Sequence, residues 1–293
     1  MAVSAATVKE LRERTGAGMM ECKRALDATD GNIERAIEEL RKSGGAKADK
    51  KAGRTTAEGT VVIRTSADGH QALMLEVNSE TDFVARDENF LQFASSVADT
   101  AMAAGVQDTA AIAGLKLADQ SITVEEARLL LISKVGENIH VRRASFVNAT
   151  TVVGTYLHGR RIGVVVTLDG DNPDLAKDLA MHIAASKPLV IAPEQVSPDL
   201  VEKEKEIYLA QAAGSGKPQD IIEKMVQGRL KKFLAEVSLV GQPFVKDPDV
   251  IIADLLNKHR VKVLSFARFE VGEGIEKETE NFADAVMAQV QGK

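Results

Sequence analysis

Hydrophobic residues in the first 43 positions recur every three or four residues, a spacing that predicts helices. Glycine-containing breaks at 15–18 and 30–32 divide this stretch into three short helices. The apolar positions that define them are Val8 and Leu11, then Met19, Met20, Cys22, Ala25 and Leu26, then Ile33, Ala36, Ile37 and Leu40. Gly44 and Gly45 predict the end of the third helix, and the small, basic residues 44–58 predict a solvated linker.

From residue 59 the pattern changes to short β-rich runs. The runs 60–64 and 72–77 flank a hairpin turn, and a helix whose apolar face includes Phe90 and Phe93 follows. A similar order of two strand-like runs and a helix recurs over 152–187. We therefore predict an α+β fold whose core contains two duplicated ββα subdomains with antiparallel sheets.

The first copy of this repeat is about four residues longer than the second between its second strand and its helix. Extra residues on a repeated scaffold are a common place for binding function. The longer connection contains Thr81, Asp82, Phe83 and Val84. One interpretation is a helix cap that begins at Ser79, with Phe83 in the core. The other is an acidic residue beside an exposed phenylalanine that inserts into a partner.

The region from Pro198 to residue 238 reads as two amphipathic helices around a turn at 214–218, which predicts an antiparallel coiled-coil hairpin. A β-rich run at 261–271 and a C-terminal helix follow. The predicted domains are 1–54 (three helices and linker), 55–150 (N-subdomain of the core), 151–197 (first part of the C-subdomain), 198–238 (helical hairpin), 239–272 (final strand of the C-subdomain) and 273–293 (C-terminal helical module).

Composition narrows the class of protein. The 293 residues carry a net charge of −6, with 4% aromatic residues and no tryptophan, which disfavours a nucleic-acid-binding protein. No apolar run is long enough for a membrane helix, and the N-terminal residues lack the pattern of a targeting signal. The single cysteine, Cys22, excludes an intramolecular disulfide and a cysteine zinc site. We expect a cytoplasmic location.

Motifs for catalysis are missing from the sequence. Residues 214–218 have proline where a phosphate-binding loop needs a hydroxyl, and the five histidines are scattered. Cys22 and His182 are expected to be structural. We therefore predict a binding protein with no catalytic residues, no metal site and no cofactor. Two alternatives stay open: a docking adaptor that binds through residues 1–54, and an enzyme with Asp82 and His158 as an acid–base pair.

Two resemblances sharpen this prediction. Residues 31–40 are similar to the last helix of ubiquitin-associated (UBA) domains, so the N-terminal module is expected to be UBA-like. Over essentially its whole length the chain resembles the bacterial elongation factor Ts family. The segments that carry this second resemblance are 8–12, 15–23, 76–85, 139–143, 182–185 with Pro188, 242–244 and 268–274.

The resemblance to elongation factor Ts implies a translation factor that promotes exchange of GDP for GTP on the GTPase elongation factor Tu, without chemical turnover or nucleotide binding of its own. It implies that Thr81, Asp82, Phe83 and Val84 disturb the Mg²⁺ site of that GTPase. The other residues that it places in contact with the partner are Met19, Met20, His158, Phe282 and Val286.

Overall fold

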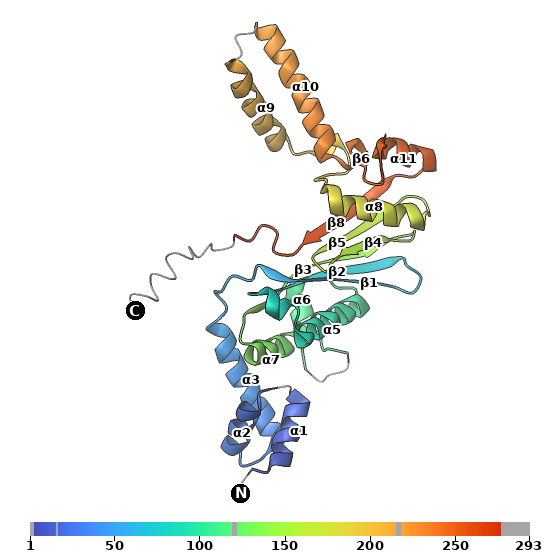
Figure 1. Ribbon diagram of the computed structural model, residues 1–293. Helices are drawn as coiled ribbons and strands as arrows, with labels where there is room; N and C mark the ends of the chain where they lie inside the picture. Colours follow the sequence, from blue (N-terminus) through green and yellow to red (C-terminus); the bar gives the residue numbers. More distant parts are fainter. Residues whose placement is uncertain (1–2, 16, 119–121, 215–217, 277–293) are drawn as a thin grey trace. The chain divides into compact units, whose positions relative to one another are not determined.

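The computed structural model describes residues 3–15, 17–118, 122–214 and 218–276, which form an α+β fold (Figure 1). The described residues contain eleven α-helices and eight strands in three small sheets. The chain divides into two compact units. The first unit comprises 1–62, 75–145 and 270–293, and the second comprises 63–74 and 146–269. The mixed α+β class agrees with the prediction from the sequence. Within the described residues, no helix combines the length and the apolar character needed to cross a bilayer.

The first unit begins with the three predicted helices: α1 (Ala5–Thr15), α2 (Met19–Ala28) and α3 (Ile33–Asp49). Asn32 caps α3 by accepting a hydrogen bond from the backbone N–H of Arg35 at 3.0 Å. The small core between these helices contains Leu11, Ala17, Cys22, Ala25, Leu26, Ala36 and Leu40. The apolar positions read from the sequence are therefore the ones that pack. The resemblance to a ubiquitin-associated domain stays a prediction.

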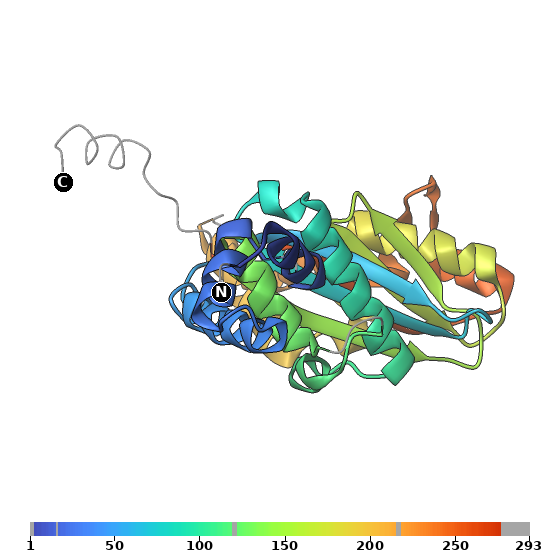
Figure 2. The same cartoon turned by 90° about the horizontal axis from the view of Figure 1, so that it is seen from below.

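The predicted end of α3 at Gly44 and Gly45 is wrong, because the helix continues to Asp49. Gly44 is buried, and a Cβ on it would lie 3.5 Å from the carbonyl oxygen of Leu129 in helix α7 (Val124–Val135). The missing side chain thus allows α3 to approach α7 closely, and Figure 2 shows the two helices side by side. The first part of the predicted 44–58 linker is consequently helical.

The first sheet has the strand order β1 (Glu58–Thr65), β2 (Gln71–Ser79) and β3 (Ile139–Asn148). The central strand β2 is buried from Ala72 to Ser79, as expected for a strand covered on both faces. The helices of this part of the chain are α4 (Asp82–Ala85), α5 (Glu88–Ala104), α6 (Thr109–Gly114) and α7. Helix α5 contributes Phe90, Phe93, Ala94, Val97 and Ala101 to the core, as its apolar spacing predicted.

The second unit contains a sheet with the order β4 (Gly154–His158), β5 (Ile162–Leu168) and β8 (Val263–Glu270). Strands β4 and β5 run antiparallel, with Gly154 opposite Val166 and His158 opposite Ile162. Helix α8 (Pro173–Ser186) packs on them through Leu175, Leu179 and Ile183. The small sheet of β6 (Pro243–Phe244) and β7 (Asp247–Ile251) and the helix α11 (Ile252–His259) were not predicted.

Strand, strand and helix follow one another twice along the chain, as β1, β2 and α5 and again as β4, β5 and α8. Residues 80–87 separate β2 from α5, whereas residues 169–172 separate β5 from α8. The first connection is thus four residues longer, as the sequence predicted. The longer connection contains the single helical turn α4. The two copies of the repeat therefore differ at the segment for which we predicted a binding function from the sequence.

Helices α9 (Pro198–Ala213) and α10 (Gln219–Val237) form the predicted hairpin in the second unit (Figure 1). They pack on each other around Ala212, Ile222 and Val226. Coiled-coil geometry and the predicted domain boundaries stay predictions. The predicted C-terminal helix, with Phe282 and Val286, lies outside the described residues.

Candidate functional site

The connection 80–87, called here the 80–87 turn, is built around one turn of helix. Thr81 is the N-cap of α4, and its hydroxyl oxygen accepts a hydrogen bond from the backbone N–H of Val84 at 3.3 Å. Asp87 ends the turn by capping α5, where it accepts hydrogen bonds from the backbone N–H groups of Asn89 and Phe90. Two caps therefore fix both ends of a segment that has no buried residue in its helix.

Phe83 is 83% exposed at the solvent side of this turn. The interpretation that placed it in the core is wrong, because the cap residue is Thr81 and not Ser79. The hydroxyl of Ser79 instead donates to the carbonyl oxygen of Thr81 at 3.0 Å. Asp82 forms an ion pair with Arg86 at 2.8 Å, and both side chains reach solvent. The structure thus presents an aromatic ring beside a charged pair.

The base of the turn is held by two carboxylates, those of Glu80 and Glu137, called here the carboxylate clamp. Glu137 accepts hydrogen bonds from the backbone N–H and the hydroxyl of Thr81, at 2.9 and 2.6 Å. Glu80 accepts one from the backbone N–H of Asn138 at 2.6 Å and lies 3.4 Å from the guanidinium of Arg54. Sequence reasoning missed Glu137 and Asn138, since no local pattern relates positions 56 residues apart.

Met19 and Met20 begin helix α2 and are 59% and 64% exposed. Two adjacent exposed methionines form a flexible apolar surface of the kind that binding sites use. Cys22, one turn later, is buried as predicted. Burial raises the pKa of its thiol, although a hydrogen bond with Thr15 opposes the shift. The predicted contact residues of this module therefore face solvent, while its structural residue does not.

His158 lies exposed at the end of β4, with its Nδ1 3.3 Å from the hydroxyl of Tyr156 and the two rings stacked. It belongs to the second unit, whereas Asp82 belongs to the first. The Asp82 carboxylate is paired with Arg86. The acid–base alternative therefore receives no support from the local contacts of either residue. His182 is buried within α8, as its structural interpretation predicted.

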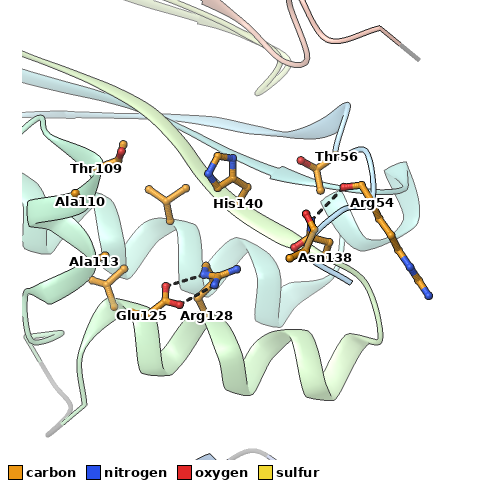
Figure 3. A pocket seen from close by; sticks show the side chains of 12 residues that line it. Arg54, Thr56, Thr109, Ala110, Ala113, Glu125, Arg128, Asn138 and His140 are labelled. Carbon is orange, nitrogen blue, oxygen red and sulfur yellow. Dashed lines mark hydrogen bonds and ion pairs between the residues drawn. The ribbon is translucent and has the colours of Figure 1, made fainter. Parts of the chain in front are cut away.

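Figure 3 shows a pocket of about 500 Å³ in the first unit. Two residues of its lining, Arg54 and Asn138, contact Glu80 of the carboxylate clamp. Arg128 donates two hydrogen bonds of 2.7 Å to Glu125 across one wall, and a third to the carbonyl oxygen of Ile139. This contact with Arg128 lowers the pKa of Glu125 against the opposing effect of burial. Burial lowers the pKa of His140 in the same pocket, and the charge of Arg128 adds to the shift.

None of the residues that the sequence singled out for function lines this pocket. The charges of Glu125 and Arg128 compensate each other. This pair therefore leaves little net charge to recognise a ligand. Across the part of the chain that the structure describes, histidine, cysteine and carboxylate side chains form no group of three or more that could hold a metal ion. The exposed 80–87 turn, not a concave pocket, is thus the best candidate for the functional site.

Comparison with known proteins gives one consistent result. The family model described as "Elongation factor TS" matches residues 80–273. The chain is 57% identical to Elongation factor Ts of Thioalkalivibrio sulfidiphilus (strain HL-EbGR7) over 294 residues, covering 100% of both chains. It is 57% identical to Elongation factor Ts of Coxiella burnetii (strain RSA 493 / Nine Mile phase I) over 286 residues, 97% of each chain. It is 55% identical to Elongation factor Ts of Legionella pneumophila (strain Paris) over 289 residues, 99% of each.

Proposed function

The chain belongs to the elongation factor Ts family, and on that premise we propose that it is a translation elongation factor that exchanges guanine nucleotides on elongation factor Tu. It binds the GDP complex of that GTPase and promotes GDP release, so that GTP can enter. It carries out no chemical turnover and acts in the cytoplasm. Neither nucleotide nor metal has to bind to this chain for that activity.

The observation that carries this proposal is the 83% exposure of Phe83 on a turn capped at both ends. An exposed phenylalanine adds little burial free energy to its own fold. A ring that is held at the surface contributes mainly when a partner buries it. Thr81, Asp82, Phe83 and Val84 form this segment. We assign to it the displacement of the groups that hold Mg²⁺ in the partner.

The physical basis is thermodynamic coupling. GDP is held on such GTPases by Mg²⁺ and by backbone N–H groups around its phosphates. A protein that binds better when these groups are displaced weakens GDP, and GDP weakens that protein by the same factor. The exchange factor therefore needs differential affinity for two states of the GTPase, not a reactive group.

One side chain does not account for a large effect. Burial of a single phenylalanine contributes about 1.5–3 kcal/mol, which corresponds to roughly a 10- to 150-fold change in an equilibrium. The remaining coupling has to come from other contacts. We assign these to Met19 and Met20 on α2, to His158 at the end of β4, and to Phe282 and Val286 outside the described residues.

The test is the release of a fluorescent GDP analogue from preloaded elongation factor Tu into excess unlabelled GDP. We expect the wild-type chain to accelerate release strongly, and we expect Phe83→Ala to lower the maximal acceleration by about tenfold or more. Because Phe83 is exposed, the same substitution changes the free energy of unfolding by less than about 0.5 kcal/mol.

Three outcomes separate the alternatives. Acceleration that Phe83→Ala and Asp82→Ala both leave unchanged would keep the function but remove the 80–87 turn as its site. No acceleration by the folded wild-type chain would reject the exchange function. In that case, binding to the GTPase through residues 1–54 alone would favour the docking adaptor.

A further inference from the structure

The 80–87 turn is oriented by a residue far away in the sequence. Glu137 lies between α7 and β3, and its carboxylate accepts two hydrogen bonds from Thr81, from the backbone N–H at 2.9 Å and from the hydroxyl at 2.6 Å. Hydrogen bonds to an ionised acceptor are stronger than those between neutral groups. Two of them converging on a single residue fix both its backbone and its side chain.

The hydroxyl of Thr81 has one proton, which it donates to Glu137. Its lone pairs are then available to Val84, whose backbone N–H lies 3.3 Å away. The N-cap of α4 therefore depends on the direction in which Glu137 holds that hydroxyl. Glu137 acts on the helical turn without touching the helix itself.

Glu80 and Asn138 repeat this contact in the opposite direction. The backbone N–H of Asn138 donates to the carboxylate of Glu80 at 2.6 Å. The side-chain amide of Asn138 donates to the carbonyl oxygens of Ala52 and Arg54, and Asn138 is buried. Residues 80 and 81 of the turn thus bond to residues 138 and 137 of the α7–β3 connection. Two adjacent contacts of this kind oppose both sliding and rotation of the 80–87 turn.

The direction of Phe83 is set at the two ends of the turn. Helix α4 has only four residues and buries none of them, and a single helical turn has no stability of its own. The ring of Phe83 is 83% exposed and makes little contact that would hold it. Its position before a partner arrives is consequently set by the hydrogen bonds of Thr81 at the base of the turn and by the Asp87 cap at its other end. Contacts that hold such a segment in one geometry keep its functional side chain in the productive direction within the complex as well.

We propose that Glu137 is a positioning residue, which holds Thr81 and thereby fixes the direction in which Phe83 projects toward the GTPase. This inference rests on the proposed exchange function. It predicts that the contribution of Phe83 to exchange is available only while the carboxylate of Glu137 is present. It also predicts that Glu137 affects the maximal rate of GDP release more than the affinity of the complex.

The experiment is a double-mutant cycle with Glu137→Ala and Phe83→Ala, read out as GDP-analogue release from elongation factor Tu over a range of concentrations of the full chain. We expect Glu137→Ala to lower the maximal rate about tenfold, the equivalent of one charge-assisted hydrogen bond. The half-saturating concentration changes less than about twofold. In the Phe83→Ala background the same substitution changes the rate by less than about twofold, because the residues act as one unit.

Two further variants keep the test decisive. Glu137→Gln removes the charge but keeps one acceptor oxygen, so we expect an intermediate maximal rate. Glu125→Ala removes a carboxylate of the same unit that bonds to Arg128 and not to the turn, and we expect the wild-type rate. Unfolding midpoints of all variants are measured first, and exchange is measured at a temperature where each is folded.

Opposing results overturn the proposal in distinguishable ways. A wild-type maximal rate for Glu137→Ala, or rate effects of Glu137→Ala and Phe83→Ala that multiply, would show that Glu137 does not act through Phe83 while leaving the exchange function in place. An equal loss of rate in Glu125→Ala would assign the effect to general loss of stability. A wild-type chain that does not accelerate release would reject the exchange function itself, and this is seen without any substitution.

Discussion

The backbone N–H of Gly272 donates a hydrogen bond of 2.9 Å to the carboxylate of Glu76, although 196 residues separate the two positions. Arg142 and Arg143 form ion pairs with the same carboxylate, at 3.0 and 2.5 Å. Arg143 also donates to the carbonyl oxygen of Glu270. This cluster joins the central strand β2 to the segment that follows β8, within the first unit.

The first prediction concerns the charge of Glu76, whose side chain is fully buried. Glu76→Ala removes the buried carboxylate that pairs with Arg142 and Arg143, while Arg143 keeps its ion pair with Glu273 at 3.4 Å. We expect the substitution to lower the free energy of unfolding by about 3 kcal/mol, the lower end of the range for a broken buried pair. Glu39→Ala, at an exposed position of α3, is the control and should change it by less than about 0.5 kcal/mol. Urea denaturation at pH 7.5 measures both. Equal effects of the two substitutions would contradict a structural role for the cluster.

The same carboxylate gives a direction for acid sensitivity. Burial alone would raise the pKa of Glu76, but the hydrogen bond from Gly272 and the two arginines outweigh it and lower the pKa below its ordinary value of 4.5. A lowered pKa means that the folded state binds the proton less readily than the unfolded state. The stabilisation is therefore fully present above pH 4.5 and is lost as the pH falls through the lowered value.

The second prediction separates a collision from an unfavourable backbone angle. Gly272 and Gly274 both have a φ of +75°. A Cβ on Gly272 would collide with the carbonyl oxygen of Ala57, whereas a Cβ on Gly274 would meet nothing within 4 Å. Gly274→Ala should cost about 1 kcal/mol for the angle alone, and Gly272→Ala roughly 1–3 kcal/mol more for the displaced backbone. Matching unfolding midpoints for the two variants would disprove the collision.

The third prediction uses the tautomer of His182. Its Nε2 lies 3.0 Å from Oε1 of Gln242, and its Nδ1 lies 3.2 Å from the backbone nitrogen of Val245. A backbone N–H is always a donor, so Nδ1 carries the lone pair and Nε2 the proton. The side-chain amide of Gln242 donates to the carbonyl oxygens of Glu236 and Ser186, which leaves its oxygen to accept from His182. The cluster therefore requires a neutral imidazole.

Protonation of His182 would add a proton to Nδ1, which would then point at the backbone N–H of Val245 and break that hydrogen bond. Burial lowers its pKa below the ordinary 6.5, although the bond to Gln242 opposes this. The unfolded state thus gains the proton first, so stability is complete above pH 6.5 and falls as the pH drops through the lowered pKa. We expect urea midpoints to decrease between pH 7.5 and 5.5.

His140 is the matched comparison, since partial burial and the charge of Arg128 lower its pKa in the same direction, whereas the residue as a whole is far more exposed than His182. His182→Gln should flatten the pH dependence of the urea midpoint more than His140→Gln does. Unchanged pH dependence in His182→Gln would disprove the requirement for a neutral imidazole at that position.

The sequence predicted what depends on nearby residues. Helical spacing, the ββα order and the longer connection are all local, and each agrees with the structure. The direction of Phe83 could not be decided, because Ser79 and Thr81 are both suitable cap residues. Moving the cap by two residues rotates a helix by about 200° and exchanges its buried and exposed faces. The continuation of α3 past Gly44 and the role of Glu137 depend on packing and hydrogen bonds between distant segments, which no local pattern encodes.

The last prediction separates binding from exchange. Met19 and Met20 are more than half exposed, so replacing both with glutamine should leave the free energy of unfolding within about 0.5 kcal/mol of wild type. If they only hold the GTPase, the double variant raises the half-saturating concentration about tenfold, the equivalent of one well-buried methionine, and leaves the maximal rate of GDP release unchanged. Leu264→Gln, at a 57% exposed position of β8, is the control and should alter neither quantity. A fall in the maximal rate would instead place the two methionines in the exchange step. No change in either quantity would remove α2 from the interface.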